Sequence, residues 1–363
     1  MREATPAIDR NRCRNRGEGA LWLNDQFVFR PLPLGRGSGR FALFTAGLGI
    51  LVAGIVSQPR AAQGQAGKNS GLRLSLVGIA VSDYPKSQAF YERVMGFPVA
   101  FKFSSPDGAR TNTFFQMSRN TFLEMQQATA DVPPGLTHAH FVVDDLSTTL
   151  ARLRQAGLPT APQKGRPANA VTEAGFSQNI FVKNANVFDP NGIRLELNEL
   201  VPESLMKKAA ESWTAAQDTR GLTLNVVGIA VKDPPESAMF YQRLIGFRVA
   251  FTFGGADPQR MNVYYQTSRD TFLEMQPAGA NLPPGLTHFH VLTSDLDATI
   301  ARLRQAGLAA AAGNAPGTIG QAVTVSPGAH VKNVNVFDPD GTRLELNEYI
   351  PESLPKKAVD SWQ

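Results

Sequence analysis

The 363-residue sequence predicts an α+β fold built from four copies of one β-α-β-β-β module. Two observations predict it. The body of the chain repeats itself after about 150 residues. Within each copy, short runs of branched apolar residues alternate with segments whose apolar residues recur at helical spacing. We expect each helix to cover one face of a mixed sheet and to leave the other face as an open cup.

The internal repeat is plain in the residues themselves. Leu76–Val81 (LVGIAV) returns almost unchanged as Val226–Val231 (VVGIAV). Matches of this kind divide the body into a first repeat at 73–217 and a second repeat at 222–363. The linker between them is short, so we expect the two repeats to pack against each other.

The first half of the first repeat contains residues that typically begin and end a helix. Ser82–Asp83 offers a helix N-cap and Gly96 a helix stop. The expected elements are a strand at Val77–Val81, a helix up to Gly96, and strands at Val99–Phe103, Thr113–Met117 and Thr121–Gln126.

The second half begins again with a strand and a helix. The expected elements are a strand at His138–Val143, a helix at Leu146–Gln155, and strands at Asn179–Val182, Asn186–Phe188 and Ile193–Asn198. The Asp189–Gly192 segment (DPNG) is typical of a turn, and we expect no chemistry from it.

The first 66 residues resemble a secretory leader. They hold nine Arg and four acidic residues. The rest of the chain has 27 basic and 27 acidic residues, so its formal charges cancel and give no reason to expect nucleic-acid binding. An apolar run, Phe41–Val56, is followed by small residues at 61–66 where a peptidase could cut. We expect a cleaved signal, a periplasmic or secreted protein, and no membrane attachment after cleavage. Cys13, the sole cysteine, lies in this leader, so the body has no disulfide.

Histidine is rare in this sequence, and its positions follow the internal repeat. Four of the five histidines stand in two matching tetrapeptides, Thr137–His140 (THAH) and Thr287–His290 (THFH). On a strand, residues i and i+2 point to the same face, so each tetrapeptide would aim two imidazoles into one space. Metal binding is a common use of such a pair. The alternative is a structural pair that a duplication copied.

Several motifs together carry a resemblance. They are Val-Gly-Ile-Ala-Val-x-Asp, then Phe-Tyr and Gly-Phe, then Asp-Pro-x-Gly-x-Arg-Leu-Glu-Leu. The sequence resembles the vicinal oxygen chelate superfamily over 73–200 and 223–349. That group includes glyoxalase I, extradiol dioxygenases, methylmalonyl-CoA epimerase, fosfomycin-resistance transferases and bleomycin-binding proteins. The resemblance implies tandem domains whose paired modules form a cup around one divalent ion.

The resemblance also implies a ligand set. Carried over residue by residue, the metal ligands are Glu124, His138 and Glu196 in the first repeat and Glu274, His288 and Glu345 in the second. The remaining ligand of the family is usually His or Gln, but Leu76 and Val226 stand in its place. Three ligands with open positions would still suit Zn, Mn, Fe or Ni. Glu124 or Glu274, if displaced from the metal, could act as a base.

Other polar residues could complete or line the site. His140 and His290 could supply the missing ligand or contact substrate. The further candidates for substrate contact are Gln126, Gln276, Asn198 and Asn347. Arg194 and Arg343 are structural alternatives as partners of the glutamates. His330 replaces Phe181 of the first repeat and is expected in a loop. Each cup could form within one repeat or across the two.

Two functions of different class follow. The leading hypothesis is an exported metal-dependent enzyme that acts on a small vicinal-oxygen substrate by lyase, isomerase or dioxygenase chemistry. The alternative is a metal-free protein that binds or sequesters a small molecule, which the missing first ligand favours. The chain would be a monomer with paired repeats or a homodimer.

Overall fold

The computed structural model describes residues 70–105, 111–162, 167–214 and 221–362. The expected leader at 1–66, with Cys13, lies outside these residues. Within the described part of the chain, no helix has both the length and the apolar character needed to cross a membrane.

Each repeat contributes ten strands. The strands of the first repeat are β1 (Arg73–Val81), β2 (Val99–Ser104), β3 (Thr111–Ser118), β4 (Thr121–Gln127), β5 (Gly135–Val143), β6 (Thr160–Ala161), β7 (Ala170–Thr172), β8 (Gly175–Ser177), β9 (Val182–Phe188) and β10 (Arg194–Leu200). Those of the second repeat are β11 (Thr223–Val231), β12 (Arg248–Phe253), β13 (Asn262–Gln266), β14 (Phe272–Pro277), β15 (Gly285–Leu292), β16 (Ala309–Ala311), β17 (Thr318–Gly320), β18 (Thr324–Val325), β19 (Val331–Phe337) and β20 (Arg343–Tyr349).

The helices follow the same duplication. The first repeat has α1 (Tyr84–Ala89), the π-helical segment η1 (Phe90–Met95), α2 (Leu146–Gln155) and α3 (Leu205–Ser212). The second repeat has α4 (Pro234–Met239), the π-helical segment η2 (Phe240–Ile245), a 3₁₀ turn η3 (Pro258–Arg260), α5 (Leu296–Gln305) and α6 (Leu354–Asp360).

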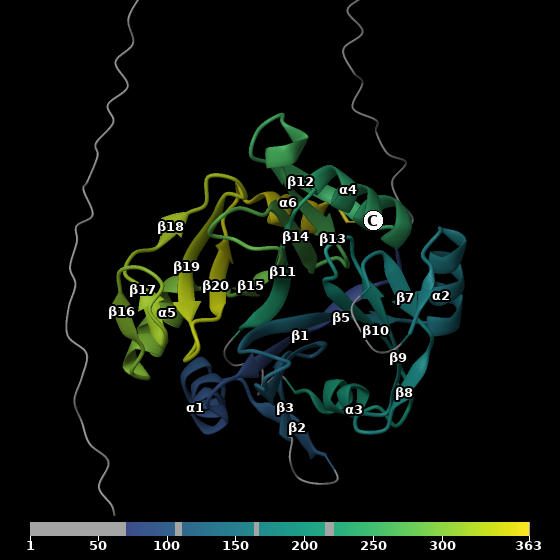
Figure 1. The fold of residues 1–363 in the computed structure, drawn as a ribbon. Coiled ribbons are helices and arrows are strands. Elements are labelled where there is room, and N and C mark those ends of the chain that lie inside the picture. The colour runs from purple at the N-terminus through teal and green to yellow at the C-terminus, as the bar shows by residue number, and fades with distance from the viewer. Residues whose placement is uncertain (1–69, 106–110, 163–166, 215–220, 363) are drawn as a thin grey trace, which may run out of the picture. The chain divides into compact units, whose positions relative to one another are not determined.

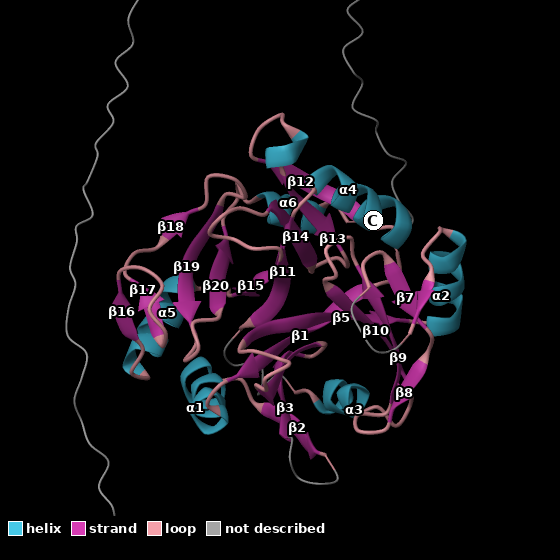
Figure 2. Ribbon diagram, in the orientation of Figure 1, coloured by secondary structure: helices cyan, strands magenta, loops and turns pink. Residues whose placement is uncertain are grey.

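The strands form two mixed sheets, one in each repeat (Figure 1, Figure 2). The first has the order β2-β3-β4-β1-β5-β10-β9-β7-β6, with β8 paired to β9, and the second repeats this order. β1 and β5, the first strands of the two modules, are antiparallel neighbours at the centre. The last strand of each module lies parallel to the first, so β4 flanks β1 and β10 flanks β5. The predicted α+β class and the repeated modules are confirmed.

Helix boundaries follow local chemistry. Asp83 caps α1 by accepting a hydrogen bond from the Lys86 amide at 3.1 Å. The helix then widens into η1 and ends at Gly96, whose φ of 81° is the left-handed conformation that glycine adopts without strain. The expected helix therefore exists, but its second half is π-helical.

One strand assignment was wrong. Asn179–Val182 was expected as a strand, whereas residues 178–181 form a turn and one strand, β9, runs from Val182 to Phe188. Phe181 has a φ of 55°, and its counterpart His330 has a φ of 54°. An extended strand cannot pass through a residue in that conformation. His330 is exposed in this turn, as the sequence predicted.

The largest apolar core is shared by the two repeats. Buried residues of both repeats form one continuous cluster, in which the Phe141 and Phe247 rings lie 5.5 Å apart. Each repeat also has a smaller cluster of its own. In the first repeat it contains Leu76, Phe114 and Phe122 with Met206 of α3, so this terminal helix packs against the sheet beside the smaller cluster.

The two repeats are joined by a reciprocal pair of hydrogen bonds. The Tyr91 hydroxyl donates to Asp338 at 2.8 Å, and the Tyr241 hydroxyl donates to Asp189 at 3.0 Å. Both aspartates are fully buried and belong to the Asp-Pro-x-Gly turns. The expectation that this turn has no chemistry of its own stays a prediction, but the turn does have a structural role, because its carboxylate accepts a hydrogen bond from the other repeat.

Two arginines reinforce this junction. Arg152 of α2 donates to the carbonyl oxygens of Leu244 and Ile245, at 3.2 and 3.0 Å. Arg302 of α5 donates to the Val94 carbonyl at 3.1 Å. Each repeat thus places one of its helices against the π-helical segment of the other.

Candidate metal centres

The predicted ligands meet on four neighbouring strands. Because β4, β1, β5 and β10 are adjacent, side chains that share one face of these strands lie side by side. Gly78 of β1 pairs with Glu124 on one side and with His138 on the other. Glu196 of β10 pairs with His140. Glutamates from the last strands therefore flank the histidines from β5.

In the first repeat four side chains converge. His138 Nε2 lies 3.3 Å from Glu124 Oε2 and 3.9 Å from Glu196 Oε2. His140 Nε2 lies 3.8 Å from Glu124 Oε2 and 3.5 Å from Glu196 Oε2. All four residues are buried. Glu124, His138 and His140 form the tightest group, and Glu196 completes it.

The second repeat has the corresponding cluster, in which the two histidines also contact each other. Glu274 Oε2 lies 3.2 Å from His288 Nε2 and 3.4 Å from His290 Nε2. Glu345 Oε2 lies 4.0 Å from His290 Nε2. The two imidazoles are hydrogen-bonded to each other, with 2.7 Å between their Nε2 atoms. Both clusters form within a single repeat, which settles the question that the sequence left open.

The Nδ1 atom of each clustered histidine contacts a neighbouring polar side chain. Thr137 Oγ1 lies 2.7 Å from His138 Nδ1, and Thr287 Oγ1 lies 2.7 Å from His288 Nδ1. The amide of Asn198 lies 2.9 Å from His140 Nδ1. These contacts fix the rings so that all of the Nε2 atoms point into the clusters.

Glycine makes room for the first histidine of each pair. A Cβ atom at Gly78 would overlap the His138 ring and come within 2.8 Å of Thr137 Oγ1. Gly228 has the same relation to the His288 ring. The glycine of the Val-Gly-Ile-Ala-Val motif is therefore required for space, because its backbone is in an ordinary extended conformation.

The glutamates of the first repeat have their own donors. Asn112 donates to Glu124 Oε1 at 2.6 Å, and Asn184 donates to Glu196 Oε1 at 3.3 Å. Arg194 Nη2 is 3.8 Å from Glu196 Oε2. The arginine suggested as a partner for Glu124 thus contacts Glu196 instead.

The second repeat supports its glutamate differently. Among the described residues, no hydrogen bond joins Asn262, the counterpart of Asn112, to Glu274. Tyr264 pairs directly with Glu274 across β13 and β14, where the first repeat has Phe114 opposite Glu124. Burial and the nearby carboxylates of Glu274 and Glu345 raise the pKa of Tyr264 well above its usual value, so the phenol stays neutral.

The surroundings of the clusters favour ionised carboxylates. Burial alone would raise the pKa of Glu274, but hydrogen bonds with His288 and His290 outweigh it and lower that pKa. Burial also opposes the lowered pKa of Glu196, which His140, His138 and Arg194 depress by their charge. Burial lowers the pKa of His288, so its ring is neutral at pH 7.

The other predicted residues lie around this core. Gln276 donates to Thr287 Oγ1 at 3.1 Å, and Gln126 is half-buried at the end of β4. Asn347 lies 2.7 Å from His290 Nδ1. Leu76 is fully buried and pairs with His140 across the strands.

Sequence reasoning missed four kinds of supporting residue. They are the two threonines before the histidine pairs, the two motif glycines, Asn184 and Tyr264. The threonines and glycines stand at the same places in both repeats, and that repetition was a usable signal. Nothing in the sequence indicates the contact of Tyr264 with Glu274, because it depends on the pairing of two strands.

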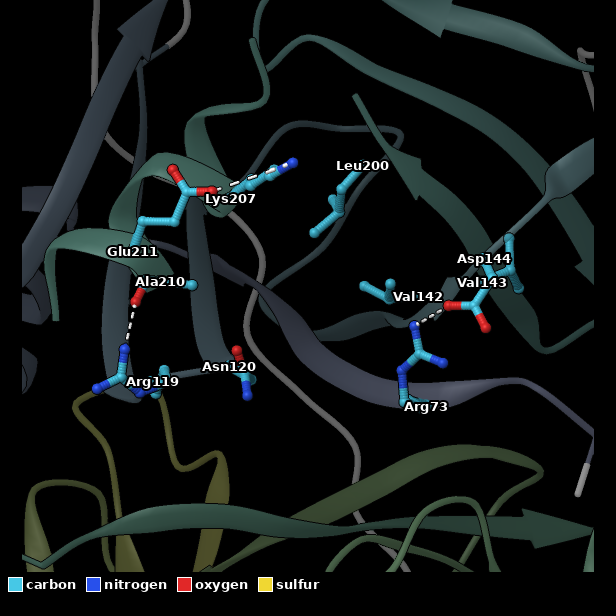
Figure 3. Close-up of a pocket in the computed structure, with 10 residues that line it drawn as sticks. All are labelled: Arg73, Arg119, Asn120, Val142, Val143, Asp144, Leu200, Lys207, Ala210 and Glu211. Carbon is cyan, nitrogen blue, oxygen red and sulfur yellow. Dashed lines mark hydrogen bonds and ion pairs between the residues drawn. The ribbon is translucent and has the colours of Figure 1, made fainter. Parts of the chain in front are cut away.

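A separate cavity of about 460 Å³ opens in the first repeat (Figure 3). Arg73, Arg119, Lys207 and Glu211 line it, together with Asp144, which forms an ion pair with Arg73 at 2.7 Å. None of the four clustered residues Glu124, His138, His140 and Glu196 belongs to its lining.

Fold and site together define a class of protein. The sequence profile of the Glyoxalase/Bleomycin resistance protein/Dioxygenase superfamily matches residues 73–197 and 223–346. The chain therefore belongs to this superfamily and carries two of its domains in tandem. A sequence comparison with curated proteins finds no match.

Several solved structures share the fold. The Mn(II)-bound glyoxalase from Novosphingobium aromaticivorans has 15% identity and a TM-score of 0.57, over 76% of this chain and 81% of that one. The 2,3-dioxygenase LapB from Pseudomonas sp. KL28 has 16% identity and a TM-score of 0.57, over 78% and 94%. A mutant of 4-hydroxymandelate synthase from Streptomyces coelicolor has 15% identity and a TM-score of 0.54, over 80% and 96%. At such low identity the likeness concerns the fold.

Proposed function

We propose that the protein is a metal-dependent enzyme with one divalent metal centre in each repeat. The observation that carries this proposal is the convergence of two histidines with one or two glutamates in a buried cluster, found twice. A carboxylate is costly to bury unless it is paired or bound to a metal. Four such residues in one place have no comparable structural need.

The spacing of the donor atoms fits a first-row metal. Ligands about 2.1 Å from a tetrahedral ion lie about 3.4 Å from one another. The His–Glu separations in the first repeat are 3.3, 3.5, 3.8 and 3.9 Å. His140 Nε2 is buried and has no hydrogen-bond partner, and a bond to a metal would give this atom a partner. Imidazole and carboxylate together suit Zn, Mn, Fe or Ni.

We assign the ligands in three steps. The resemblance supplies Glu124, His138 and Glu196, with Glu274, His288 and Glu345 as their counterparts. Leu76 cannot bind a metal, but it lies directly opposite His140 in the β1–β5 pair. His140 therefore reaches the same region from the neighbouring strand. In our proposal His140 and His290 complete two ligand sets of two histidines and two glutamates.

The chemistry follows from this arrangement. A bound divalent metal would polarise an oxygen atom of a small substrate that carries two neighbouring oxygens. Glu124 and Glu274 are the candidate bases, since each faces the cluster and is buried. Asn112 would hold Glu124 in position through its 2.6 Å hydrogen bond. The relatives in structure include proteins described as glyoxalases and dioxygenases, which supports isomerase, lyase or dioxygenase chemistry as the class.

A metal-free binding protein is the second candidate. The apolar Leu76 and Val226 favour it, and so does the 2.7 Å hydrogen bond between His288 and His290, which satisfies two Nε2 atoms without an ion. Such a protein would hold a small molecule in the same cup. The two candidates give opposite results in one experiment.

Metal analysis of the purified protein tests the proposal. After exposure to Zn, Mn, Fe or Ni, the wild type should hold two equivalents of metal for each chain. His138→Ala and His288→Ala should each lose one equivalent, and the double variant both. His330→Ala is the matched control, because His330 is exposed in a turn, and it should keep both. A wild-type protein that binds none of these metals and gains no thermal stability from them would support the binding protein instead.

We also propose that the protein is exported. The basic residues, the apolar run Phe41–Val56 and the small residues at 61–66 support a cleaved leader. N-terminal sequencing of the protein from the periplasm or the medium should find a start near 61–66. An intact N-terminus in the cytosolic fraction alone would contradict export.

A further inference from the structure

The second histidine of each pair has an unusual neighbour. His140 Nδ1 lies 2.9 Å from Asn198 Nδ2, and His290 Nδ1 lies 2.7 Å from Asn347 Nδ2. Both asparagines are buried, at 0% and 2% exposure, on the last strand of their sheets. An amide has a donor at one end and an acceptor at the other, so the end that faces the ring dictates where the ring carries its proton.

The hydrogen bonds of the second repeat form a consistent chain. Asn347 Nδ2 donates to His290 Nδ1, so a His290 ring with a single proton carries it on Nε2. His290 Nε2 then donates to His288 Nε2, 2.7 Å away. His288 therefore carries its proton on Nδ1 and donates it to Thr287 Oγ1 at 2.7 Å. In this state the Nε2 lone pair of His288 accepts the proton of His290, and the protonated Nε2 of His290 has no lone pair for a metal.

This arrangement leaves several polar atoms poorly paired. Glu274 Oε2 lies 3.2 Å from His288 Nε2 and 3.4 Å from His290 Nε2, where it competes with His288 for the proton of His290. The Oδ1 atoms of Asn198 and Asn347 are buried without a hydrogen-bond partner, and so is His140 Nε2. Buried polar atoms of this kind carry a cost. In the first repeat the unpartnered amide oxygen and the unpartnered ring nitrogen lie at opposite ends of one Asn–His contact.

A 180° rotation of the asparagine amide would give its oxygen atom a partner. With Oδ1 toward the ring, the amide would accept the proton of Nδ1. Nε2 would then carry a lone pair and could bind a metal, as a histidine ligand must. The rotation needs no movement of the backbone, because the amide group has nearly the same shape in both orientations.

We propose that Asn198 and Asn347 are positioning residues that select the tautomer of His140 and His290 and thereby convert them from hydrogen-bond donors into metal ligands. The inference rests on the proposed metal centres. It explains how a chain with leucine and valine at the usual ligand position obtains a fourth ligand from the next strand. In this proposal His138 and His288 bind the metal through Nε2, and His140 and His290 become ligands when the amide turns.

The metal-free protein provides the first test. Ring ¹⁵N shifts, measured by NMR with each histidine assigned through its alanine variant, report the tautomer. His140 and His290 should carry their proton on Nε2 in the wild type. In Asn198→Asp and Asn347→Asp they should carry it on Nδ1, because a carboxylate only accepts. A wild type with the proton already on Nδ1, or Asp variants with unchanged tautomers, would overturn the proposal.

Metal affinity provides the second test, measured with Zn²⁺ against a competing chelator at pH 8. Asn198→Leu should weaken binding in the first repeat by about 10–100-fold, as for other residues that orient a ligand. Asn198→Asp should bind at least as tightly as the wild type. Asn179→Asp is the matched control, because Asn179 is exposed in the 178–181 turn. It adds the same charge away from the cluster.

The outcomes separate this inference from the proposed function. If Zn²⁺ binds and the Asp and Leu variants of Asn198 lose affinity equally, the tautomer model is wrong while the metal centre stands. Unfolding curves in urea check that each variant is folded. If no variant binds Zn²⁺, the proposed function fails, and the NMR measurement still decides whether the asparagine sets the tautomer.

Discussion

Gly78 lies directly opposite His138 in the antiparallel β1–β5 pair, and the imidazole ring occupies the space that any side chain at position 78 would fill. The glycine is therefore part of the candidate metal centre although it would supply no ligand atom. It also belongs to the motif by which the repeat was first recognised. Gly228 and His288 repeat the relationship.

The first prediction concerns this space. Gly78→Ala should displace the His138 ring and remove one of the two metal equivalents, because the added methyl overlaps the ring and backbone shifts in a packed strand are costly. Metal content for each chain is the measurement. Gly71→Ala is the control, since nothing lies within 4 Å of a Cβ atom there, although its φ of 73° will cost some stability. Retention of both metal ions in Gly78→Ala would contradict the model.

The second prediction concerns the junction of the repeats. Tyr91→Phe and Tyr241→Phe should each lower the free energy of unfolding by about 1.5–3 kcal/mol, the usual contribution of a hydrogen bond to a charged group. Urea unfolding provides the measurement. Tyr84→Phe is the comparison, because Tyr84 bonds to Thr113 within its own repeat at 2.6 Å. Equal small losses in all three variants would argue against a special role for the junction.

The third prediction is a pH dependence. Burial raises the pKa of Asp189 and Asp338 despite the hydrogen bonds that each accepts. A raised pKa in the folded state gives stability that is present below the ordinary value of 3.8 and is lost as pH rises through the folded value. The stability of the wild type relative to Asp189→Asn should therefore fall across a pH window that begins near the ordinary pKa of 3.8 and ends above the raised folded-state pKa of Asp189.

Unfolding curves at several pH values within that window test this. Asparagine can still accept from Tyr241, so the variant should remain folded. The comparison with the variant is essential, because the lowered pKa values of Glu196 and Glu274 give the opposite slope. A constant difference between wild type and variant would show that Asp189 does not titrate differently on folding.

The fourth prediction concerns the difference between the two centres. Tyr264→Phe should weaken metal binding in the second repeat by about 10-fold, because its hydroxyl lies beside the Glu274 ligand. Phe114→Tyr, the reciprocal change, should leave the first centre unaltered, since Asn112 already holds Glu124. Competition titrations on chains with one centre removed by His→Ala would separate the sites. Identical responses in both repeats would refute the distinction.

The fifth prediction follows from linkage. Metal at 100 times its dissociation constant should stabilise each occupied centre by about 2.7 kcal/mol, provided that the unfolded chain does not bind it. Chelation should reverse the effect. Differential scanning fluorimetry with Zn²⁺ and then with chelator measures both. The His138→Ala, His288→Ala double variant should show no change with either addition.

The sequence by itself determined the fold class, the duplication and the candidate ligands. Apolar periodicity and turn residues are local, and they placed α2 at Leu146–Gln155, as the structure has it. The repeat doubled every observation, so that paired histidines and glutamates stood out. The strand expected at Asn179–Val182 is not formed, because Phe181 has a positive φ. A phenylalanine in the sequence does not indicate that conformation.

Only the tertiary structure decided how these residues meet. Whether Glu124 faces His138 or His288 depends on which strands are neighbours and in what register, and pairing between strands distant in sequence is not written in either strand alone. The same holds for the space at Gly78, for the contact of Asn198 with His140, and for the bond from Tyr91 to Asp338 of the other repeat. The local sequence identified the residues of the candidate sites, and the packing of the sheets determined which of these residues contact each other.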